Sequence, residues 1–422
     1  MRSLGSFAAM LMLAALHPLS GHAADATPST PAPRHWATSW TAAPQAAWSG
    51  DFLLPTGLPF QLRQQTLRQV ARLSIGGSRL RVELSNEYGS QPLRIAAAHV
   101  ALHRDGSATT PGSDRALHFG GLRELELAPG AKAVSDAVDL PLPALSHVAV
   151  SLYLAQPTAP ATFHWDARQT AYLVAGNRAA EAQWPASAGT LSARVFLSAL
   201  IVESPRPPMV VVALGDSLTD GNGATPDADR RWPDALAERL QEHGVAVLNA
   251  GISGGRLLRD GMGPSALARL QRDALGRSGV RALIVMLGTN DIGWPGGPFA
   301  PEEPPVTAEA MVAGLRQLIA RAQAQNVRVI GATIPPNEGA LQGTPLEGHH
   351  SAAKEQVRLA VNRWIRESGA FDTVLDFDVV LRDPARPARL RATLDSGDHL
   401  HPGDAGYRAM AQAIDLRILL GE

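Results

Sequence analysis

Hydrophobic and polar positions follow two different patterns along the chain, and the change falls near residue 206. From about residue 35 to residue 203, short apolar runs alternate with polar residues, as in Leu80–Leu84 and in part of Val148–Leu154. Turn signals rich in Gly, Pro and Ser separate these runs. Several short strands at this spacing, with few stretches of helical periodicity, predict a β-sandwich or jelly-roll domain over residues 35–203.

Beyond a Pro-rich linker at residues 204–208, apolar runs of strand length alternate with amphipathic stretches of helix length. The predicted strands are 209–214, 245–249, 281–287, 327–333 and 373–377, and the predicted helices are 232–243, 264–276, 307–325, 351–368 and 405–419. Strands that alternate with helices in this way form parallel sheets covered by helices on both faces. We therefore expect an α/β domain over residues 209–422, a three-layer sandwich with a five-stranded, doubly wound parallel sheet.

The N-terminus combines a positive charge at Arg2, an apolar stretch from Phe7 to Leu16 and a short segment that ends in Ala23. This pattern is typical of a secretory signal peptide. A membrane anchor is the alternative, but the apolar stretch is shorter than the ~20 residues that cross a bilayer. We expect a signal peptide at residues 1–23, a flexible leader at residues 24–34, and a secreted or periplasmic protein without integral membrane association.

Bulk composition narrows the possible partners and chemistries. The 422 residues include 38 Lys and Arg against 39 Asp and Glu, whereas a surface for nucleic acid or anionic membrane needs a basic excess. The sequence contains no cysteine, which excludes disulfides, thiolate metal sites and a cysteine nucleophile. We therefore expect no nucleic-acid partner and a nucleophile of another type.

A serine stands at the end of the first predicted strand of the α/β half. Gly215-Asp216-Ser217-Leu218 follows an apolar run and precedes a predicted loop at residues 219–223, and active sites of open α/β sheets assemble at this edge. Since a serine hydroxyl needs an adjacent base to act as a nucleophile, His401 is the candidate base and Asp398 the candidate acid that orients it. Asp395 and Asp404 are alternative acids, and simple turn or helix-cap roles are the alternative for each residue.

Acyl transfer also requires fixed hydrogen-bond donors around the oxygen that becomes negative in the transition state. The backbone N–H of Ser217 and the side-chain amide of Asn290, in Gly288-Thr289-Asn290-Asp291 after the third strand, are two candidates. The backbone N–H of Gly254, in the loop after the second strand, is the third. Trp294 follows Asn290 closely and is a candidate substrate contact, with simple packing as an equal alternative.

Taken together, these motifs resemble the SGNH hydrolases, the GDSL esterase family. The family's four blocks are similar to Gly215–Leu218, to the stretch around Gly254, to Gly288–Asp291 and to Asp398–His401. The resemblance covers roughly residues 209–422. It implies a flavodoxin-like sheet and an acyl-enzyme mechanism, with Ser217 as nucleophile and neither a metal nor another cofactor.

The first half is also similar to a known type of protein, the secreted bacterial GDSL proteins with an N-terminal β-domain. The stretches that are similar are His35–Thr41 and Arg81–Gly89. No catalytic residue is implied for this half.

The sequence thus predicts a secreted serine esterase. Because Trp294 is the only large apolar residue beside the site loops, we expect short acyl groups, acetyl above all, on a small-molecule or polysaccharide ester. A lipid-directed acylhydrolase or thioesterase and a carbohydrate-binding protein with a vestigial hydrolase site are the alternatives. A metal pair of His399 and His401 lacks a third ligand, so we expect no metal site, and His349-His350 is predicted to be a solvated corner.

Overall fold

The computed structural model of the protein describes residues 34–204 and 206–420. Arg34–Glu422 cluster into one compact unit. The predicted signal peptide and residues 24–33 of the predicted leader lie outside the described residues. Each helix in the described part of the chain is too short or too polar to span a bilayer.

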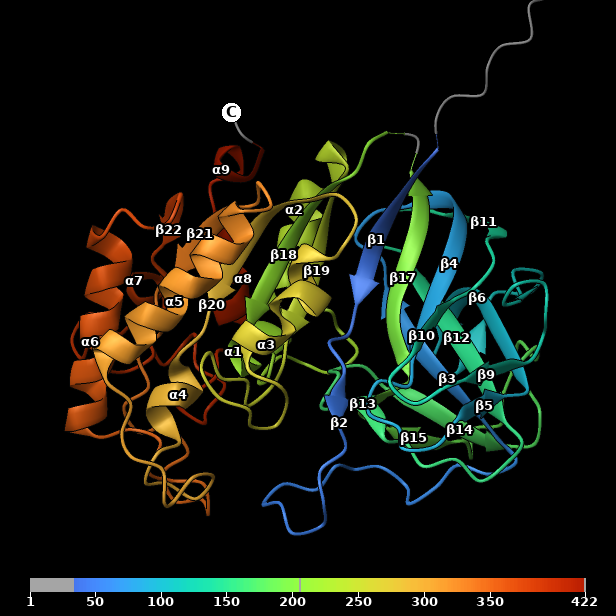
Figure 1. Cartoon of the computed structure of the whole chain (residues 1–422), viewed down its shortest axis with the longest axis horizontal. Coiled ribbons are helices and arrows are strands. Elements are labelled where there is room, and N and C mark those ends of the chain that lie inside the picture. Colours follow the sequence, from blue (N-terminus) through green and yellow to red (C-terminus); the bar gives the residue numbers. More distant parts are fainter. Residues whose placement is uncertain (1–33, 205, 421–422) are drawn as a thin grey trace, which may run out of the picture. The chain divides into compact units, whose positions relative to one another are not determined.

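The first half of the chain is a β-sandwich of antiparallel strands, as its alternating pattern predicts (Figure 1). One sheet has the order β1–β17–β4–β10, with β11 also paired to β4, and the other has the order β15–β14–β3–β12–β6–β7, with β8 paired to β6. Leu80 and Val82 of β4 and Val148 and Val150 of β12 are buried in one core cluster. The strands are β1 (His35–Thr41), β2 (Gln45–Ala46), β3 (Gln65–Arg72), β4 (Gly77–Ser85), β5 (Leu93–Ile95), β6 (Ala97–Asp105), β7 (Ala108–Thr109), β8 (Arg115–Ala116), β9 (Leu125–Leu127), β10 (Lys132–Val134), β11 (Val138–Leu142), β12 (His147–Leu154), β13 (Thr162–His164), β14 (Ala171–Ala175), β15 (Gly189–Leu191), β16 (Arg194–Val195) and β17 (Leu197–Ser204).

The second half alternates parallel strands with helices, again as predicted (Figure 1). Its five-stranded sheet has the order β19–β18–β20–β21–β22, which is the flavodoxin-like order. The strands are β18 (Met209–Gly215), β19 (Val245–Gly251), β20 (Val280–Met286), β21 (Arg328–Ala332) and β22 (Thr373–Leu375). The helices are α1 (Ser217–Asp220), α2 (Trp232–Leu240), η1 (Gln241–His243), α3 (Ala266–Leu270), η2 (Gln271–Leu275), α4 (Thr289–Gly293), α5 (Ala308–Gln323), α6 (Ala352–Glu367), α7 (Phe377–Leu381), α8 (Asp404–Gln412) and α9 (Leu416–Leu420).

The structure differs from the predicted elements mainly in the short helices. The helix α1 begins at Ser217 and includes Thr219 and Asp220, the first residues of the predicted loop 219–223. The Asp216 side chain caps this turn by accepting a hydrogen bond from the Leu218 N–H at 3.0 Å. The helix predicted over residues 264–276 consists of α3 followed directly by a π-helical turn, η2. The predicted helix 405–419 is split into α8 and α9, and at the break the Asp415 side chain accepts a hydrogen bond from the Arg417 N–H at 3.0 Å.

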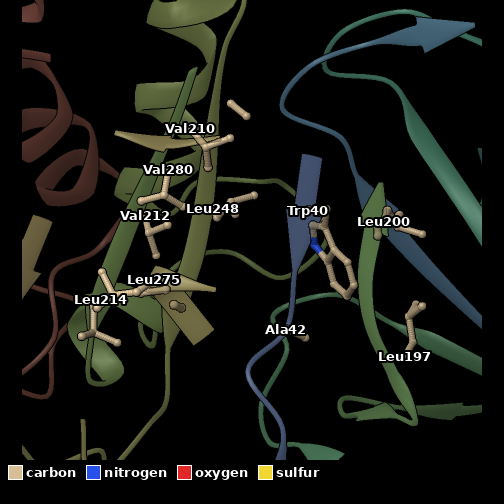
Figure 2. Close-up of a cluster of buried hydrophobic side chains, with 14 of the residues drawn as sticks. Trp40, Ala42, Leu197, Leu200, Val210, Val212, Leu214, Leu248, Leu275 and Val280 are labelled. Atoms are coloured by element: carbon tan, nitrogen blue, oxygen red, sulfur yellow. The ribbon is translucent and has the colours of Figure 1, made fainter. Parts of the chain in front are cut away.

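One hydrophobic cluster runs from the β-sandwich into the α/β half. Figure 2 shows Trp40 of β1 between Leu200 of β17 and Leu248 of β19, with Val210 of β18 beyond Leu248, and all four side chains belong to one buried cluster. At the same boundary the Thr41 hydroxyl donates a hydrogen bond of 3.0 Å to the Asn249 carbonyl. The two patterns of the sequence therefore correspond to two halves of one packed unit.

Ion pairs also connect the β-half with the α/β half. Arg272 of η2 lies 2.7 Å from Glu87 of the β-half, and the adjoining Arg277 lies 3.1 Å from Glu83 of β4. These four side chains are mostly shielded from solvent, so the attraction between the charges is less screened than at an open surface.

Candidate active site

Loops at the C-terminal ends of β18, β19 and β20 converge on one cavity of about 270 Å³. This is the sheet edge at which the sequence places the site. All six residues singled out from the sequence line it, namely Ser217, Gly254, Asn290, Trp294, Asp398 and His401.

Ser217, His401 and Asp398 form a row of hydrogen bonds in this cavity. The Nε2 atom of His401 lies 2.8 Å from the Ser217 Oγ atom, and its Nδ1 atom lies 2.6 Å from Asp398 Oδ2. Because an ionised carboxylate can only accept, Nδ1 carries the imidazole proton and Nε2 is left to accept the serine proton. Burial by itself would raise the pKa of Asp398, but the hydrogen bond and the charge of His401 outweigh it, so this pKa lies well below its usual range.

The two alternative acids are engaged elsewhere. Asp395 Oδ2 lies 2.5 Å from the Nδ1 atom of His399, whose side chain is largely exposed. Asp404 accepts hydrogen bonds of 2.8 Å from both the backbone N–H and the hydroxyl of Thr225. Asp398 is therefore the acid that the fold places against His401.

The helix α1 fixes the serine. As its first residue, Ser217 has a backbone N–H that no carbonyl of the helix can accept, so this donor is available to a bound group. Ser217 is buried apart from the atoms that line the cavity. A short, capped helix thus presents a hydroxyl and an N–H group to the same space.

The loop after β19 requires glycine at position 254. Gly254 has a φ of +69°, and a Cβ atom there would lie 2.5 Å from Met262 Sδ and 2.9 Å from Trp294 Cζ2. A side chain would therefore displace this loop, because both the backbone conformation and the space exclude it. Its backbone lies against the cavity without a side chain in the way.

Two groups of the helix α4 hold the same loop. The Asn290 side-chain amide donates a hydrogen bond of 3.0 Å to the Gly255 carbonyl. The Asp291 carboxylate accepts hydrogen bonds from the backbone N–H groups of Leu257, at 2.7 Å, and Leu258, at 2.9 Å. Since one amide hydrogen of Asn290 is used in this way, the other is left for the cavity.

A buried histidine of the β-half supports this loop from the opposite side. His164 lies 2.9 Å from the Ala43 carbonyl through Nδ1 and 3.0 Å from Asp220 Oδ1 through Nε2. Asp220 in turn accepts hydrogen bonds from the backbone N–H and the hydroxyl of Ser253, at 2.9 and 2.8 Å. Burial lowers the pKa of His164, but the charge and hydrogen bond of Asp220 outweigh it and leave the pKa raised.

Several residues that line the cavity were missed in the sequence. The β-half contributes Leu54, Trp165 and Asp166, and the α/β half adds Met262 and Phe299. These positions follow no short motif, because long-range packing brings them to the site. The premise that Trp294 is the only large apolar residue beside the site is therefore wrong.

His349 corrects another expectation. We predicted a solvated corner for His349-His350, but the His349 side chain is buried and lines the cavity. It packs on Gly293, where a Cβ atom would lie 2.3 Å from its Nε2 atom. Burial lowers the pKa of His349 to about 3, so the ring is neutral at physiological pH.

The histidines near the C-terminus pair with separate carboxylates rather than with each other. His399 bonds Asp395 and His401 bonds Asp398. Within residues 34–204 and 206–420, no cluster of three or more His, Asp or Glu side chains is placed to hold a metal ion.

Comparison with known proteins agrees with the motifs. Residues 213–409 match the model of the GDSL-like lipase/acylhydrolase family. Similar solved structures include an acetylxylan esterase from Geobacillus stearothermophilus, at 24% identity over 50% of this chain and 94% of that one, with a TM-score of 0.35. A GDSL-like lipase from Bacteroides thetaiotaomicron is 15% identical over 51% of this chain and 93% of that one, with a TM-score of 0.38. No curated protein matches this chain at a significant level.

The matched range divides the cavity into two sets of residues. It contains Ser217, His401 and the other polar residues singled out from the sequence, whereas Leu54 and Trp165 lie before it. The family match therefore covers the motif residues and the rest of the lining from the α/β half, and not the part that the β-half provides.

Proposed function

We propose that this chain, whose residues 213–409 match the GDSL-like lipase/acylhydrolase family, is a carboxylic ester hydrolase that acts as a serine esterase through Ser217. The observation that supports this most directly is the row of hydrogen bonds from Ser217 through His401 to Asp398. An alcohol next to a neutral imidazole, which a carboxylate orients, is the arrangement that activates a serine.

In the first step, Ser217 Oγ attacks the ester carbonyl while His401 Nε2 takes its proton. The N–H groups of Ser217 and Gly254 and the amide of Asn290 donate hydrogen bonds to the oxyanion. The intermediate then expels the alcohol, which receives the proton from His401, and an acyl-enzyme remains. In the second step, water loses a proton to His401 and releases the acid, and Asp398 stabilises the imidazolium each time.

The finer part of the proposal concerns substrate and location. We propose short acyl groups, acetyl foremost, on a small-molecule or polysaccharide ester, and a secreted or periplasmic protein. The cavity of about 270 Å³ is small beside the ~300–1,000 Å³ of typical ligand pockets, which supports a compact substrate over a long lipid chain. The pattern of Arg2, the apolar stretch and Ala23 supports export.

The nucleophile is tested with p-nitrophenyl acetate. Ser217→Ala should reduce kcat by several powers of ten, since the loss of a triad member removes most of the acceleration, and thermal unfolding should confirm that the variant folds. EDTA should leave the wild-type rate unchanged. Turnover by folded Ser217→Ala that matches the wild type would rule out this mechanism.

The acyl preference is tested with p-nitrophenyl esters from acetate to palmitate, with acetylated xylan alongside. We expect the highest kcat/KM among the shortest esters. A maximum at octanoate or beyond, without acetate released from xylan, would favour the lipid-directed alternative. A folded wild type inert on every ester would favour the carbohydrate-binding alternative.

A further inference from the structure

The β-half supplies one wall of the cavity that holds Ser217. Leu54, in the segment between β2 and β3, and Trp165, just after β13, line this wall. Met262, Trp294 and Phe299 of the α/β half line the cavity with them, and all five belong to one apolar cluster. The wall is therefore apolar, and neither half forms it alone.

Aromatic rings connect this wall to the oxyanion loop. The ring centroids of Trp48 and Phe52 lie 5.1 Å apart, and those of Phe52 and Phe299 lie 5.8 Å apart. Phe299 stacks on Trp294 at 4.6 Å, and Trp294 contacts the Gly254 backbone. A group against this wall would therefore lie next to the donors that hold the reacting carbonyl.

Hydrogen bonds fix the wall before any substrate binds. The fully buried Gln45 donates to the Met262 carbonyl at 2.7 Å and accepts from the Trp165 backbone N–H at 2.8 Å. The indole N–H of Trp48 donates to the Leu54 carbonyl at 2.7 Å, and that of Trp165 donates to the Pro55 carbonyl at 3.1 Å. One amide thus joins both halves at the cavity, and two indoles hold the segment that carries Leu54.

We propose that this wall is a subsite for one ring-sized apolar group of the ester, in either its acyl or its alcohol part. An apolar cavity of ~150 Å³ is sufficient to bind benzene, so about 270 Å³ holds such a ring beside the reacting carbonyl. Aromatic walls favour a ring through offset or edge-to-face contacts. The inference rests on the proposed function, because it takes Ser217 as the attacking group.

The β-half adds one polar side chain to the cavity, the carboxylate of Asp166, which lies 3.4 Å from Arg168. The side chains of Leu54, Met262 and Phe299 offer no hydrogen bond to a hydroxyl. Against these three side chains an apolar ring fits better than a sugar ring of the same size, whose hydroxyl groups would lose water there without a partner.

Three esters with leaving groups of similar reactivity test the subsite, namely ethyl acetate, benzyl acetate and ethyl phenylacetate. Benzyl acetate places the ring in the alcohol part, and ethyl phenylacetate places it in the acyl part. We expect kcat/KM for one of the two to exceed that for ethyl acetate by about tenfold, the usual discrimination of an apolar pocket. A singly acetylated sugar, 6-O-acetylglucose, serves as the polar competitor of ring size.

Variants of neighbouring leucines localise the effect. Leu54→Ala should reduce the preference for the ring ester several-fold, and Trp165→Ala should reduce it further. Leu53→Ala is the matched control, because Leu53 belongs to the same segment but is 51% exposed and does not line the cavity. Leu53→Ala should leave the preference for the ring ester unchanged.

Binding to Ser217→Ala separates the subsite from the esterase activity. Calorimetry should show that benzyl acetate or ethyl phenylacetate binds this variant more tightly than ethyl acetate, and that adding Leu54→Ala removes the difference. Equal handling of all three esters, or a preference for 6-O-acetylglucose, would overturn the subsite and leave the esterase standing. A wild type that binds ring esters through Leu54 without hydrolysing them would overturn the proposed esterase and leave the subsite standing.

Discussion

At the scale of single residues, Asp398 and Asp395 offer a sharp comparison. Both carboxylates bond the Nδ1 atom of a nearby histidine, but only the partner of Asp398, His401, reaches Ser217. An amide at position 398 would favour the wrong imidazole tautomer, so Asp398→Asn should lower kcat on p-nitrophenyl acetate by about 10⁴-fold.

Asp395→Asn and Asp404→Asn are the controls for this experiment and should retain most activity. Asp395 pairs with the exposed His399, and Asp404 holds Thr225. An inactive Asp395→Asn with an active Asp398→Asn would show that Asp395, and not Asp398, orients the catalytic histidine.

Asp216, directly before the serine, makes stability depend on pH. Burial raises its pKa to about 7, and its Oδ2 atom has no hydrogen-bond partner among the described residues. The unfolded chain loses this proton near pH ~4. Between the two values the folded state holds a proton that the unfolded state has lost, so the free energy of unfolding falls as pH rises from about 4 to about 7.

Asp216→Asn removes this titration while keeping an oxygen that can cap α1. The melting temperature of the variant relative to wild type should therefore increase between pH 5 and pH 8, measured by calorimetry at several pH values. An equal difference at both ends of this range would show that Asp216 does not titrate there.

At the scale of elements, one buried arginine holds the ends of two strands. Arg269 of α3 donates to the carbonyls of Gly215, the last residue of β18, at 2.8 Å, and of Ala250, the last but one of β19, at 2.6 Å. Arg269→Met would remove both hydrogen bonds and leave the Gly215 carbonyl with only the 3.2 Å bond from the Ile252 N–H, at a cost of about 1.5–3 kcal/mol for each bond to the charged guanidinium. Urea unfolding should show that loss of stability, and kcat should fall because Ser217 follows β18.

Arg281 of β20 provides the comparison, since its side chain is exposed. Arg281→Met should change both stability and kcat little. If Arg269→Met behaved in the same way, the strand ends would be held by the sheet itself, without the arginine.

Elements were predictable where a pattern extends over many residues. Apolar runs such as 209–214 predicted the buried strands, because a parallel strand covered on both faces has apolar side chains throughout. The start of α1 was not predictable in this way, because a cap at Asp216 and not periodicity defines that turn. The resemblance carried by the motifs, and not their spacing, implied the flavodoxin-like order.

The motif residues of the candidate site and Trp294 were predictable from the sequence, whereas the wall from the β-half and the buried His349 were not. Ser217 and His401 stand at strand and helix ends, where local sequence indicates position. Leu54 and Trp165 reach the cavity only through packing between the two halves, and nothing in their neighbouring residues marks this.

At the scale of the whole molecule, the shared core predicts that both halves unfold together. Trp40 and Leu200 lie in the same buried cluster as Val210 and Leu248, so separating the halves would expose apolar surface on each. We expect one thermal transition, with the same midpoint by calorimetry and by tryptophan fluorescence. Trp40→Ala should lower that midpoint without splitting it.

Two transitions, or a folded and active fragment of residues 209–422, would contradict this prediction. The comparison variant is Phe60→Ala, because Phe60 is almost fully exposed on the β-half. Phe60→Ala should leave the midpoint of thermal unfolding unchanged.

The bridge that Gln45 forms between Trp165 and Met262 has a consequence for how such enzymes diversify. The reactive machinery and the wall beside it are encoded in separate stretches of the gene. Substitutions around residues 48–55 can retune which esters are accepted while every catalytic motif stays intact. Two chains with identical motifs can therefore differ in substrate specificity. A directed-evolution library aimed at substrate range belongs in residues 48–55.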